Sequence, residues 1–346
     1  MRILITGGAG MVGSHCAEYF AQKGDRVVIL DNLMRSRLFG FDKRSVEFNW
    51  NYLKKYPNII RIKGDIRNEK DVLKALGDGV DAVIHTAGQP GVLLSVKEPE
   101  EDFSINCLGT LKVLEGTRQV CKNAVLVYCS TNKVYGENVD AAPLKEIATR
   151  YVFAGIKGIA EGLPTDLTGH TPYGVSKLAG DLYVQEYGRI YGMRTAVFRM
   201  SCIYGTRQFG FEDQGWVAWF IIAALHDKPI TIYGNGKQVR DVLYVADLVG
   251  AFEKFINGKS KSAVFNIGGG PENTLSLLEF IAKLKKLTGK KIKLKFDDWR
   301  PSDQKVYISD IAKVREALRW QPKVRPDEGI AKLIKWVKDN ENYFLR

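Results

Sequence analysis

The sequence lacks the cysteine and histidine patterns that build metal centres and disulfide frameworks. Its five cysteines are scattered and form no CxxC pair: Cys16, Cys107, Cys121, Cys129 and Cys202. The four histidines also lack the spacing of metal ligands: His15, His85, His170 and His226. We therefore expect small buried thiols in a reducing, cytoplasmic compartment, and no metal site.

Long apolar runs are missing too, as are internal repeats and low-complexity tracts. No run approaches the roughly 18–20 apolar residues that a membrane-spanning helix needs. The opening stretch MRILITGGAG has only a short apolar run before its glycines, which is not typical of a signal peptide. We expect no membrane partner, and the 346 residues allow one large domain or two smaller ones that share a cleft.

Acidic residues are fewer than basic ones. The chain has 39 Asp and Glu against 51 Lys and Arg, which gives a net charge of +12. This excess is compatible with a nucleic-acid surface, with attraction of phosphate-bearing small molecules, or with solvated lysine-rich helices. The lysines are spread along the chain, apart from one dense patch at 283–291. We favour solvated faces, then phosphate-bearing ligands, and expect no nucleic-acid partner.

The first half of the chain alternates short apolar runs with amphipathic stretches. The predicted strands are 2–6, 26–30, 59–64, 82–87 and 124–130, and the predicted helices between them include 12–23, 69–76 and 106–121. This alternation predicts an α/β fold with a doubly wound parallel sheet covered by helices on both faces. Segment 32–58 is longer than a connection needs and is predicted to be an insertion with its own short helix. Residues 230–248 suggest a β-hairpin.

A glycine-rich turn follows the first predicted strand. Gly7, Gly10 and Gly13 have the spacing GxxGxxG, and a helix is predicted to begin near Met11. Glycines let the backbone approach a pyrophosphate closely, and a helix N-terminus favours an anion, as in Rossmann folds. Asp31 ends the second strand, 18 residues after Gly13, where a carboxylate can bind ribose hydroxyls. The turn therefore predicts a dinucleotide site that favours NAD over NADP.

Two neighbouring features bear on this cofactor prediction. Arg35 and Arg37 closely follow Asp31, and an arginine there can accommodate the 2′-phosphate of NADP. Asp65 and Ile66 end the third strand and could flank the adenine, although an ordinary loop aspartate is the alternative.

Tyr173 and Lys177 are candidates for the reaction centre. They stand four residues apart, which places them on the same face of a helix. A phenol has a pKa near 10, but a lysine ammonium and a positively charged nicotinamide beside it would favour the phenolate. Tyr173 could then remove a proton from a substrate hydroxyl as hydride leaves the same carbon.

These stretches together resemble the extended short-chain dehydrogenases/reductases, in the group of NAD-dependent sugar epimerases and dehydratases. The resemblance covers nearly the whole chain and rests on TGGAGMVG (6–13), Asp31, GDI (64–66), HTAGQ (85–89), NCLGT (106–110), STNKVYG (130–136), YGVSK (173–177) and RDVLYVADL (240–248). It implies that Tyr173 is the base, that Lys177 binds the cofactor ribose and that Thr131 hydrogen-bonds the reacting sugar oxygen. The cofactor-binding residues are then Gly7, Gly10, Met11, Val12, Asp31, Asn32, Asp65, Ile66, Ala87, Gln89, Asn106, Tyr173 and Lys177.

The resemblance also implies a substrate site and a division of the chain. Arg240 and Arg300 match arginines that bind the diphosphate of a nucleotide sugar, although surface salt bridges are the alternative. Residues 1–178 would form the NAD-binding domain, to which the chain returns near 195–205 and 237–267. Residues 179–346 would mainly bind the nucleotide sugar. The stretches 106–121 and 174–191 would pair in a homodimer, although burial within one chain explains their apolar content equally well.

Fold alone does not decide among the reactions of this family. Dehydratases of the family carry an Asp-Glu pair after the catalytic threonine, whereas this chain has Asn132 and Lys133 there, so dehydration is not expected. The stretches 130–136, 168–177 and 199–220 resemble epimerases that invert C2 of a CDP-linked hexose. Asn132, Lys133, His170, Arg207 and residues 209–214 would then shape the sugar pose, with a helix-start role as the alternative for His170. A 4-epimerase of a UDP-linked or other nucleotide sugar remains the alternative function.

Overall fold

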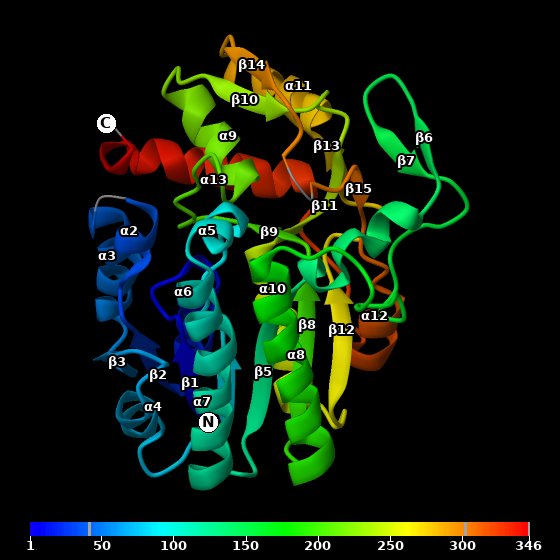
Figure 1. The fold of residues 1–346 in the computed structure, drawn as a ribbon. Helices are drawn as coiled ribbons and strands as arrows, with labels where there is room; N and C mark the ends of the chain where they lie inside the picture. Colours follow the sequence, from blue (N-terminus) through cyan, green and yellow to red (C-terminus); the bar gives the residue numbers. More distant parts are fainter. Residues whose placement is uncertain (41–42, 301–302, 345–346) are drawn as a thin grey trace.

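A seven-stranded, fully parallel sheet organises the computed structural model, which describes residues 1–40, 43–300 and 303–344 (Figure 1). Its strand order is β12-β8-β5-β4-β1-β2-β3. The strands are β1 (Arg2–Thr6), β2 (Arg26–Asp31), β3 (Ile59–Lys63), β4 (Ala82–His85), β5 (Val125–Thr131), β8 (Thr195–Met200) and β12 (Ala263–Ile267). The parallel sheet and its helices confirm the predicted Rossmann-type fold.

Helices cover both faces of this sheet because successive side chains of each strand point to opposite sides. Ile3 and Ile5 belong to one buried core, whereas Leu4 between them belongs to the other. The first core also holds residues of α1 (Met11–Gln22), α10 (Val245–Asn257) and α12 (Ala312–Leu318). The second holds residues of α4 (Glu69–Leu76), α7 (Gly109–Val120) and α8 (Pro172–Tyr191), and α7 and α8 stand side by side in Figure 1.

A smaller group of elements lies beyond the carboxyl ends of the main strands, at the top of Figure 1. One small sheet contains β9 (Cys202–Tyr204), β11 (Val239–Tyr244), β13 (Thr274–Ser276) and β15 (Val306–Tyr307). A second contains β10 (Ile230–Tyr233) and β14 (Leu294–Asp297). Their apolar core includes α9 (Trp216–Leu225), α11 (Leu277–Thr288) and α13 (Pro326–Asp339).

The hairpin predicted over residues 230–248 is wrong. β10 pairs in parallel with β14, and β11 pairs with β9, β13 and β15, so the two consecutive strands belong to different sheets. The turn between them, which includes Gly234 and Gly236 at positive φ, resembles a hairpin turn locally. Local sequence cannot show which partner each strand finds across the chain.

The segment that follows β2 forms two helices where one was predicted. These are α2 (Arg35–Phe39) and α3 (Lys43–Tyr52), followed by a 3₁₀ turn (Leu53–Lys55). Phe48 on α3 packs edge-on against Phe209 and Trp336, with ring centroids 5.6 and 5.8 Å apart. The insertion is therefore held between the main sheet and α13.

The remaining elements are short and lie mostly around the carboxyl edge of the sheet. They are α5 (Val92–Lys97), α6 (Pro99–Phe103), a π-helical stretch (Ser104–Leu108), a 3₁₀ segment (Asn132–Ala141), β6 (Leu144–Glu146), β7 (Tyr151–Phe153) and a final 3₁₀ turn (Glu341–Tyr343). No helix within the described ranges is both long enough and apolar enough to cross a membrane.

Candidate active site

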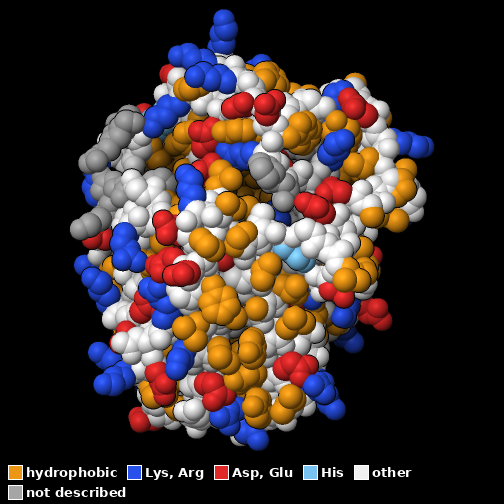
Figure 2. Space-filling view, in the orientation of Figure 1, with side chains coloured by type: hydrophobic (Ala, Val, Ile, Leu, Met, Phe, Trp, Pro, Cys, Tyr) orange, Lys and Arg blue, Asp and Glu red, His pale blue; other side chains and the backbone are white. Residues whose placement is uncertain are grey.

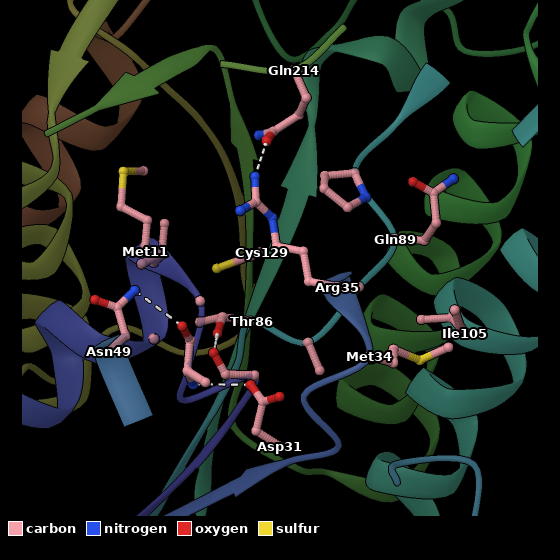
Figure 3. Close-up of a pocket in the computed structure, with 18 of the residues that line it drawn as sticks. Met11, Asp31, Met34, Arg35, Asn49, Thr86, Gln89, Ile105, Cys129 and Gln214 are labelled. Atoms are coloured by element: carbon pink, nitrogen blue, oxygen red, sulfur yellow. Dashed lines mark hydrogen bonds between the residues drawn. The ribbon is translucent and has the colours of Figure 1, made fainter. Parts of the chain in front are cut away.

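A cavity of about 360 Å³ opens at the carboxyl ends of β1, β2, β4 and β5 (Figure 3). Ligands of open parallel sheets bind at this edge because the loops that leave the strands gather there. The cavity is lined by fourteen of the predicted site residues: Gly7, Gly10, Met11, Val12, Asp31, Asn32, Asp65, Ile66, Ala87, Gln89, Thr131, Tyr173, Lys177 and Arg207.

The glycine turn between β1 and α1 is packed so closely that side chains do not fit. Gly7 has φ of +70°, and a Cβ there would lie 2.6 Å from the Ala87 backbone nitrogen. A Cβ on Gly13 would lie 2.2 Å from the Gly7 carbonyl oxygen. Gly10 caps α1 without a side-chain hydrogen bond, so the first backbone amides of the helix are left for a ligand. This cradle fits the pyrophosphate of a dinucleotide.

Asp31 ends β2 at the wall of the cavity. Its carboxylate accepts hydrogen bonds from the backbone amides of Ala9 at 2.9 Å and Leu33 at 2.8 Å. Burial raises the pKa of Asp31, while these two amides oppose the rise. Asn32 donates a hydrogen bond of 2.9 Å to Asp65, so the ends of β2 and β3 are tied together. The carboxylate is positioned as a ribose ligand would require.

Two buried polar atoms on the α1 side of the cavity lack a hydrogen-bond partner within the described residues, one a donor and the other an acceptor. Arg207 forms an ion pair of 2.7 Å with Glu18 on α1, and its guanidinium lies 4.4 Å from the Tyr52 ring centroid. Its Nη2, like Oδ1 of Asn49, has no hydrogen-bond partner among the residues the structure describes. Buried polar groups are normally paired, so a ligand in this cavity would satisfy them. Arg207, predicted to shape the sugar pose, thus stands beside the helix of the glycine turn.

Tyr173, Lys177 and Thr131 converge on the same cavity from two elements. Thr171 and Pro172 begin α8, which places Tyr173 and Lys177 on its first two turns, and Thr131 is the last residue of β5. A hydrogen bond from Thr131 lowers the pKa of Tyr173, but burial has the larger effect and raises it to about 12. Burial also lowers the pKa of Lys177 to about 8.

The pKa of Tyr173 therefore moves upward in the protein alone, whereas the sequence predicts that Lys177 and a charged nicotinamide together lower it. Lys177 is not among the groups that shift the pKa of Tyr173. The lysine ammonium lies 4.2 Å from the Tyr128 ring centroid, which stabilises the cation. A charged cofactor has to supply the remaining stabilisation of the phenolate.

A buried hydrogen-bond network lies behind this centre and was missed by the sequence analysis. Asp102 accepts hydrogen bonds from Gln89 at 2.8 Å, Asn106 at 3.0 Å and Ser176 at 2.5 Å. The side-chain oxygen of Asn106 also accepts a hydrogen bond of 2.8 Å from the backbone amide of Gln89. Asn106 lies in the π-helical stretch, and π-helical turns are frequent at functional sites. Asn106 is outside the cavity lining and instead fixes the loop that carries Gln89. Asp102 stands just before a predicted helix, and no sequence pattern around it indicates that it holds a buried hydrogen-bond network.

Five predicted substrate residues lie outside the cavity lining: Asn132, Lys133, His170, Arg240 and Arg300. Arg240 forms an ion pair of 2.6 Å with Asp303, and Arg300 forms one of 2.9 Å with Asp213. The Arg300 guanidinium also lies 3.7 Å from the Tyr233 ring centroid. Both arginines are therefore held by carboxylates that a diphosphate could replace.

The other three substrate candidates differ in their surroundings. Asn132 donates a hydrogen bond of 3.5 Å to the buried Gln304. Burial, followed by the nearby charge of Arg240, lowers the pKa of Lys133 to about 8. His170 shares a hydrogen bond of 2.9 Å between its Nε2 and the carbonyl oxygen of Thr165, within the loop that precedes α8.

No group of three His, Cys, Asp or Glu side chains in residues 1–40, 43–300 and 303–344 could hold a metal ion. The polar chemistry of the cavity is instead that of a dinucleotide cradle joined to a tyrosine–lysine pair.

Comparison with known proteins agrees with this arrangement. The model of the NAD dependent epimerase/dehydratase family matches residues 3–268. The chain is 40% identical to CDP-paratose 2-epimerase of Salmonella typhi, over 97% of this chain and 99% of that protein. It is 31% identical to a putative UDP-glucose 4-epimerase of Methanocaldococcus jannaschii, over 98% of this chain and 99% of that protein.

A solved structure extends the comparison. The crystal structure of UDP-glucuronic acid 4-epimerase from Bacillus cereus, with UDP-glucuronic acid and NAD, is 28% identical and superposes with a TM-score of 0.82. It covers 98% of this chain and 100% of that chain. These findings confirm the predicted family, the NAD cofactor and the class of nucleotide-sugar epimerases. The chain is a member of the NAD-dependent epimerase/dehydratase family, within the extended short-chain dehydrogenases/reductases.

Proposed function

We propose that this protein inverts C2 of a CDP-linked hexose by transient oxidation to a keto-sugar and re-reduction. The observation that carries the proposal is the convergence of Tyr173, Lys177 and Thr131 on the cavity that holds the glycine cradle. The 40% identity to a CDP-paratose 2-epimerase supports C2 as the reacting carbon. Asn132 and Lys133 at the positions of the dehydratase acid pair support epimerisation over dehydration.

In this proposal the protein moves one proton and orients one sugar. Bound NAD accepts a hydride from the sugar carbon and later returns it. Tyr173, as phenolate, removes the proton of the C2 hydroxyl as hydride leaves C2, and Thr131 hydrogen-bonds the reacting oxygen. The flat carbonyl then presents its other face, and Tyr173 gives the proton back to the oxygen when hydride returns. Lys177, with its pKa of about 8, is still charged at neutral pH and would bind the cofactor ribose.

The nucleotide sugar would bind mainly to residues 179–346, which we propose as the substrate domain, with residues 1–178 binding NAD. Arg240 and Arg300 would leave Asp303 and Asp213 and bind the diphosphate through their planar guanidinium groups. Asn132, Lys133 and His170 would shape the sugar pocket between the two parts. A cytoplasmic location stays a prediction.

We also propose a homodimer through α7 and α8. Large apolar side chains of these helices and the preceding turn are exposed: Phe103, Leu108, Val120, Val175, Leu182, Tyr183, Ile190 and Tyr191. Figure 2 shows hydrophobic side chains gathered over the face where α7 and α8 lie in Figure 1. An apolar patch of this kind is typical of a protein–protein contact.

A UDP-sugar 4-epimerase is the second candidate, because the relatives from M. jannaschii and B. cereus carry that name. One experiment separates the two. The purified protein is incubated with CDP-paratose, CDP-glucose and UDP-glucose, without added NAD, and the products are followed by NMR. Inversion at C2 of a CDP-sugar is expected. Inversion at C4 without inversion at C2 would refute the first candidate.

The role of Tyr173 is tested in the same assay. Tyr173→Phe should lower kcat by about a thousandfold, because the phenyl ring cannot carry the proton. Retention of NAD by the variant is the control for an intact cofactor site. Near-normal turnover by Tyr173→Phe would refute its role as the base.

A further inference from the structure

Residues 207–214 run past the cavity between β9 and α9. Arg207, Gln208, Phe209 and Gln214 all line it. One nitrogen of the Arg35 guanidinium, Nη2, donates to the Phe209 carbonyl at 2.9 Å and to the Gln214 side-chain oxygen at 2.9 Å. Figure 3 shows the Arg35 side chain extending through the site to Gln214. A single side chain thus joins α2 to two points of this segment, 174 and 179 residues away in sequence.

Arg35 is itself a wall residue of the cavity and follows Asp31 and Asn32 closely in the chain. Burial lowers the pKa of its guanidinium to about 10, so Arg35 is still charged at neutral pH. The sequence raised Arg35 only as an arginine that can accommodate a 2′-phosphate, with NAD favoured over NADP. In the structure its guanidinium donates two hydrogen bonds to neutral oxygens of the segment 207–214.

A second connection joins the same segment to the glycine turn. Asn49 on α3 is buried, and its Nδ2 donates to the Ala9 carbonyl at 3.0 Å and to the Arg207 carbonyl at 3.4 Å. Aromatic contacts continue the wall, because Phe39 and Phe211 lie 5.0 Å apart between ring centroids. The insertion and the segment therefore form one continuous side of the cofactor cavity.

Residues 212 and 213, which lie between the two Arg35 contacts, are held from the substrate side. Arg300 pairs with Asp213 at 2.9 Å, and the Tyr233 hydroxyl donates to Glu212 at 3.0 Å. The segment is thus held at residues 209 and 214 by an arginine of the cofactor side, and at residue 213 by an arginine proposed to bind substrate.

We propose that residues 207–214 are a strap that closes the NAD pocket, and that Arg35 is the positioning residue that fastens it. The strap slows NAD release, so that one cofactor molecule stays bound through both hydride transfers. The inference rests on NAD binding and on no particular substrate. Its test therefore does not depend on whether C2 is the reacting carbon of the sugar.

The test measures NAD release from the purified holoprotein. Protein with bound NAD is desalted rapidly, and free NAD is followed over time with a coupled dehydrogenase. Arg35→Met keeps the apolar stem and removes the donors, whereas Gln214→Leu removes the acceptor. Each change should accelerate release about tenfold, the effect of losing one or two hydrogen bonds. The double variant should release NAD no faster than Arg35→Met alone, because replacing Arg35 already removes the contact with Gln214.

Arg37→Met is the matched control, because Arg37 is on the same helix but is exposed and paired with Glu101 at 3.0 Å. It should release NAD at the wild-type rate. Arg35→Lys keeps the charge and a donor on a shorter side chain that reaches the two acceptors less well, so its release rate should lie between those of wild type and Arg35→Met. It serves as the test if Arg35→Met does not fold. Release rates within twofold of wild type for the Arg35 variants and Gln214→Leu would overturn the strap. Acceleration by the Arg35 variants alone would also overturn it, since Arg35 would then contact the cofactor directly.

Discussion

The Ser176 hydroxyl donates a hydrogen bond of 2.5 Å to the buried carboxylate of Asp102, which stands 74 residues earlier in the chain. Ser176 immediately precedes Lys177 on α8, and Asp102 also accepts from Gln89 and Asn106. One carboxylate therefore joins the helix that carries Tyr173 and Lys177 to the loop that lines the cavity.

Replacing the Asp102 carboxylate should change both kcat and the pH dependence of kcat/KM. The charge of Asp102 raises the pKa of Tyr173 and of Lys177, so Asp102→Asn should lower both values. The phenolate then forms at lower pH, and the acid limb of the pH profile of kcat/KM should move down by up to about one unit. We expect kcat to fall about tenfold as the network loosens. The exposed Asp78→Asn is the control, and an unshifted profile would contradict the electrostatic role of Asp102.

Truncating Arg240 and truncating Asp303 should change KM for the nucleotide sugar in opposite directions. Arg240→Ala should raise KM for the nucleotide sugar about a hundredfold, because a charge-assisted contact to the diphosphate is lost. Asp303→Ala should lower KM, because the carboxylate no longer competes with the diphosphate. Arg189→Ala, which breaks an exposed ion pair with Glu186, is the control. Steady-state kinetics check both, and a raised KM in Asp303→Ala would argue against the exchange of partners.

Stability should fall on mild acidification because of His85. Its Nδ1 lies 2.6 Å from the Thr6 hydroxyl and its Nε2 lies 3.0 Å from Thr110, and burial lowers its pKa from 6.5 to about 3. The folded protein holds His85 neutral, whereas the unfolded chain binds a proton below about pH 6.5. The contribution of neutral His85 to the free energy of unfolding is therefore complete above pH 6.5 and is lost as the pH falls towards 3.

At pH 5 this loss should amount to about 2 kcal/mol of the free energy of unfolding. Urea denaturation of the wild type and of His85→Gln at pH 7 and pH 5 measures it. The variant is less stable at pH 7 but should lose about 2 kcal/mol less between the two pH values. Equal losses in the two proteins would show that His85 does not titrate on unfolding.

A single charge placed in the proposed dimer contact should prevent dimer formation. Leu182 on α8 is 49% exposed, and Leu182→Glu would place a carboxylate in the apolar patch. We expect the wild type to sediment as a dimer and Leu182→Glu as a monomer in sedimentation velocity. Ile60→Glu is the control, because Ile60 is 58% exposed on the edge strand β3, away from α7 and α8. A monomeric wild type would refute the contact.

Features that depend on neighbours in the chain could be predicted without a structure. The glycine turn, Asp31 at the end of β2 and the Tyr173–Lys177 spacing are all short-range patterns, and each lines the cavity as expected. The strand–helix alternation predicted the parallel sheet for the same reason. The spacing of apolar residues records which side of each element is buried.

Features that depend on distant partners were missed or misread. The β10–β11 hairpin was wrong because β10 pairs with β14, more than 60 residues away in sequence. Asp102 and Asn49 were not singled out, since an isolated polar residue has no periodicity. The hydrogen bond of Arg35 to the 207–214 segment and the ion pair of Arg207 with Glu18 were not predicted, because each joins residues far apart in the sequence.

The residue types of the site could be predicted from the sequence: a dinucleotide cradle, a tyrosine–lysine pair, and an amide and a lysine where dehydratases carry acids. The pKa values of those groups depend on the folded chain. Burial raises the pKa of Tyr173 and lowers that of Lys177, and it depends on helices and loops far away in sequence. The closure of the cavity by residues 207–214 is likewise tertiary, because a hydrogen bond between Arg35 and Gln214 forms only once the chain has folded.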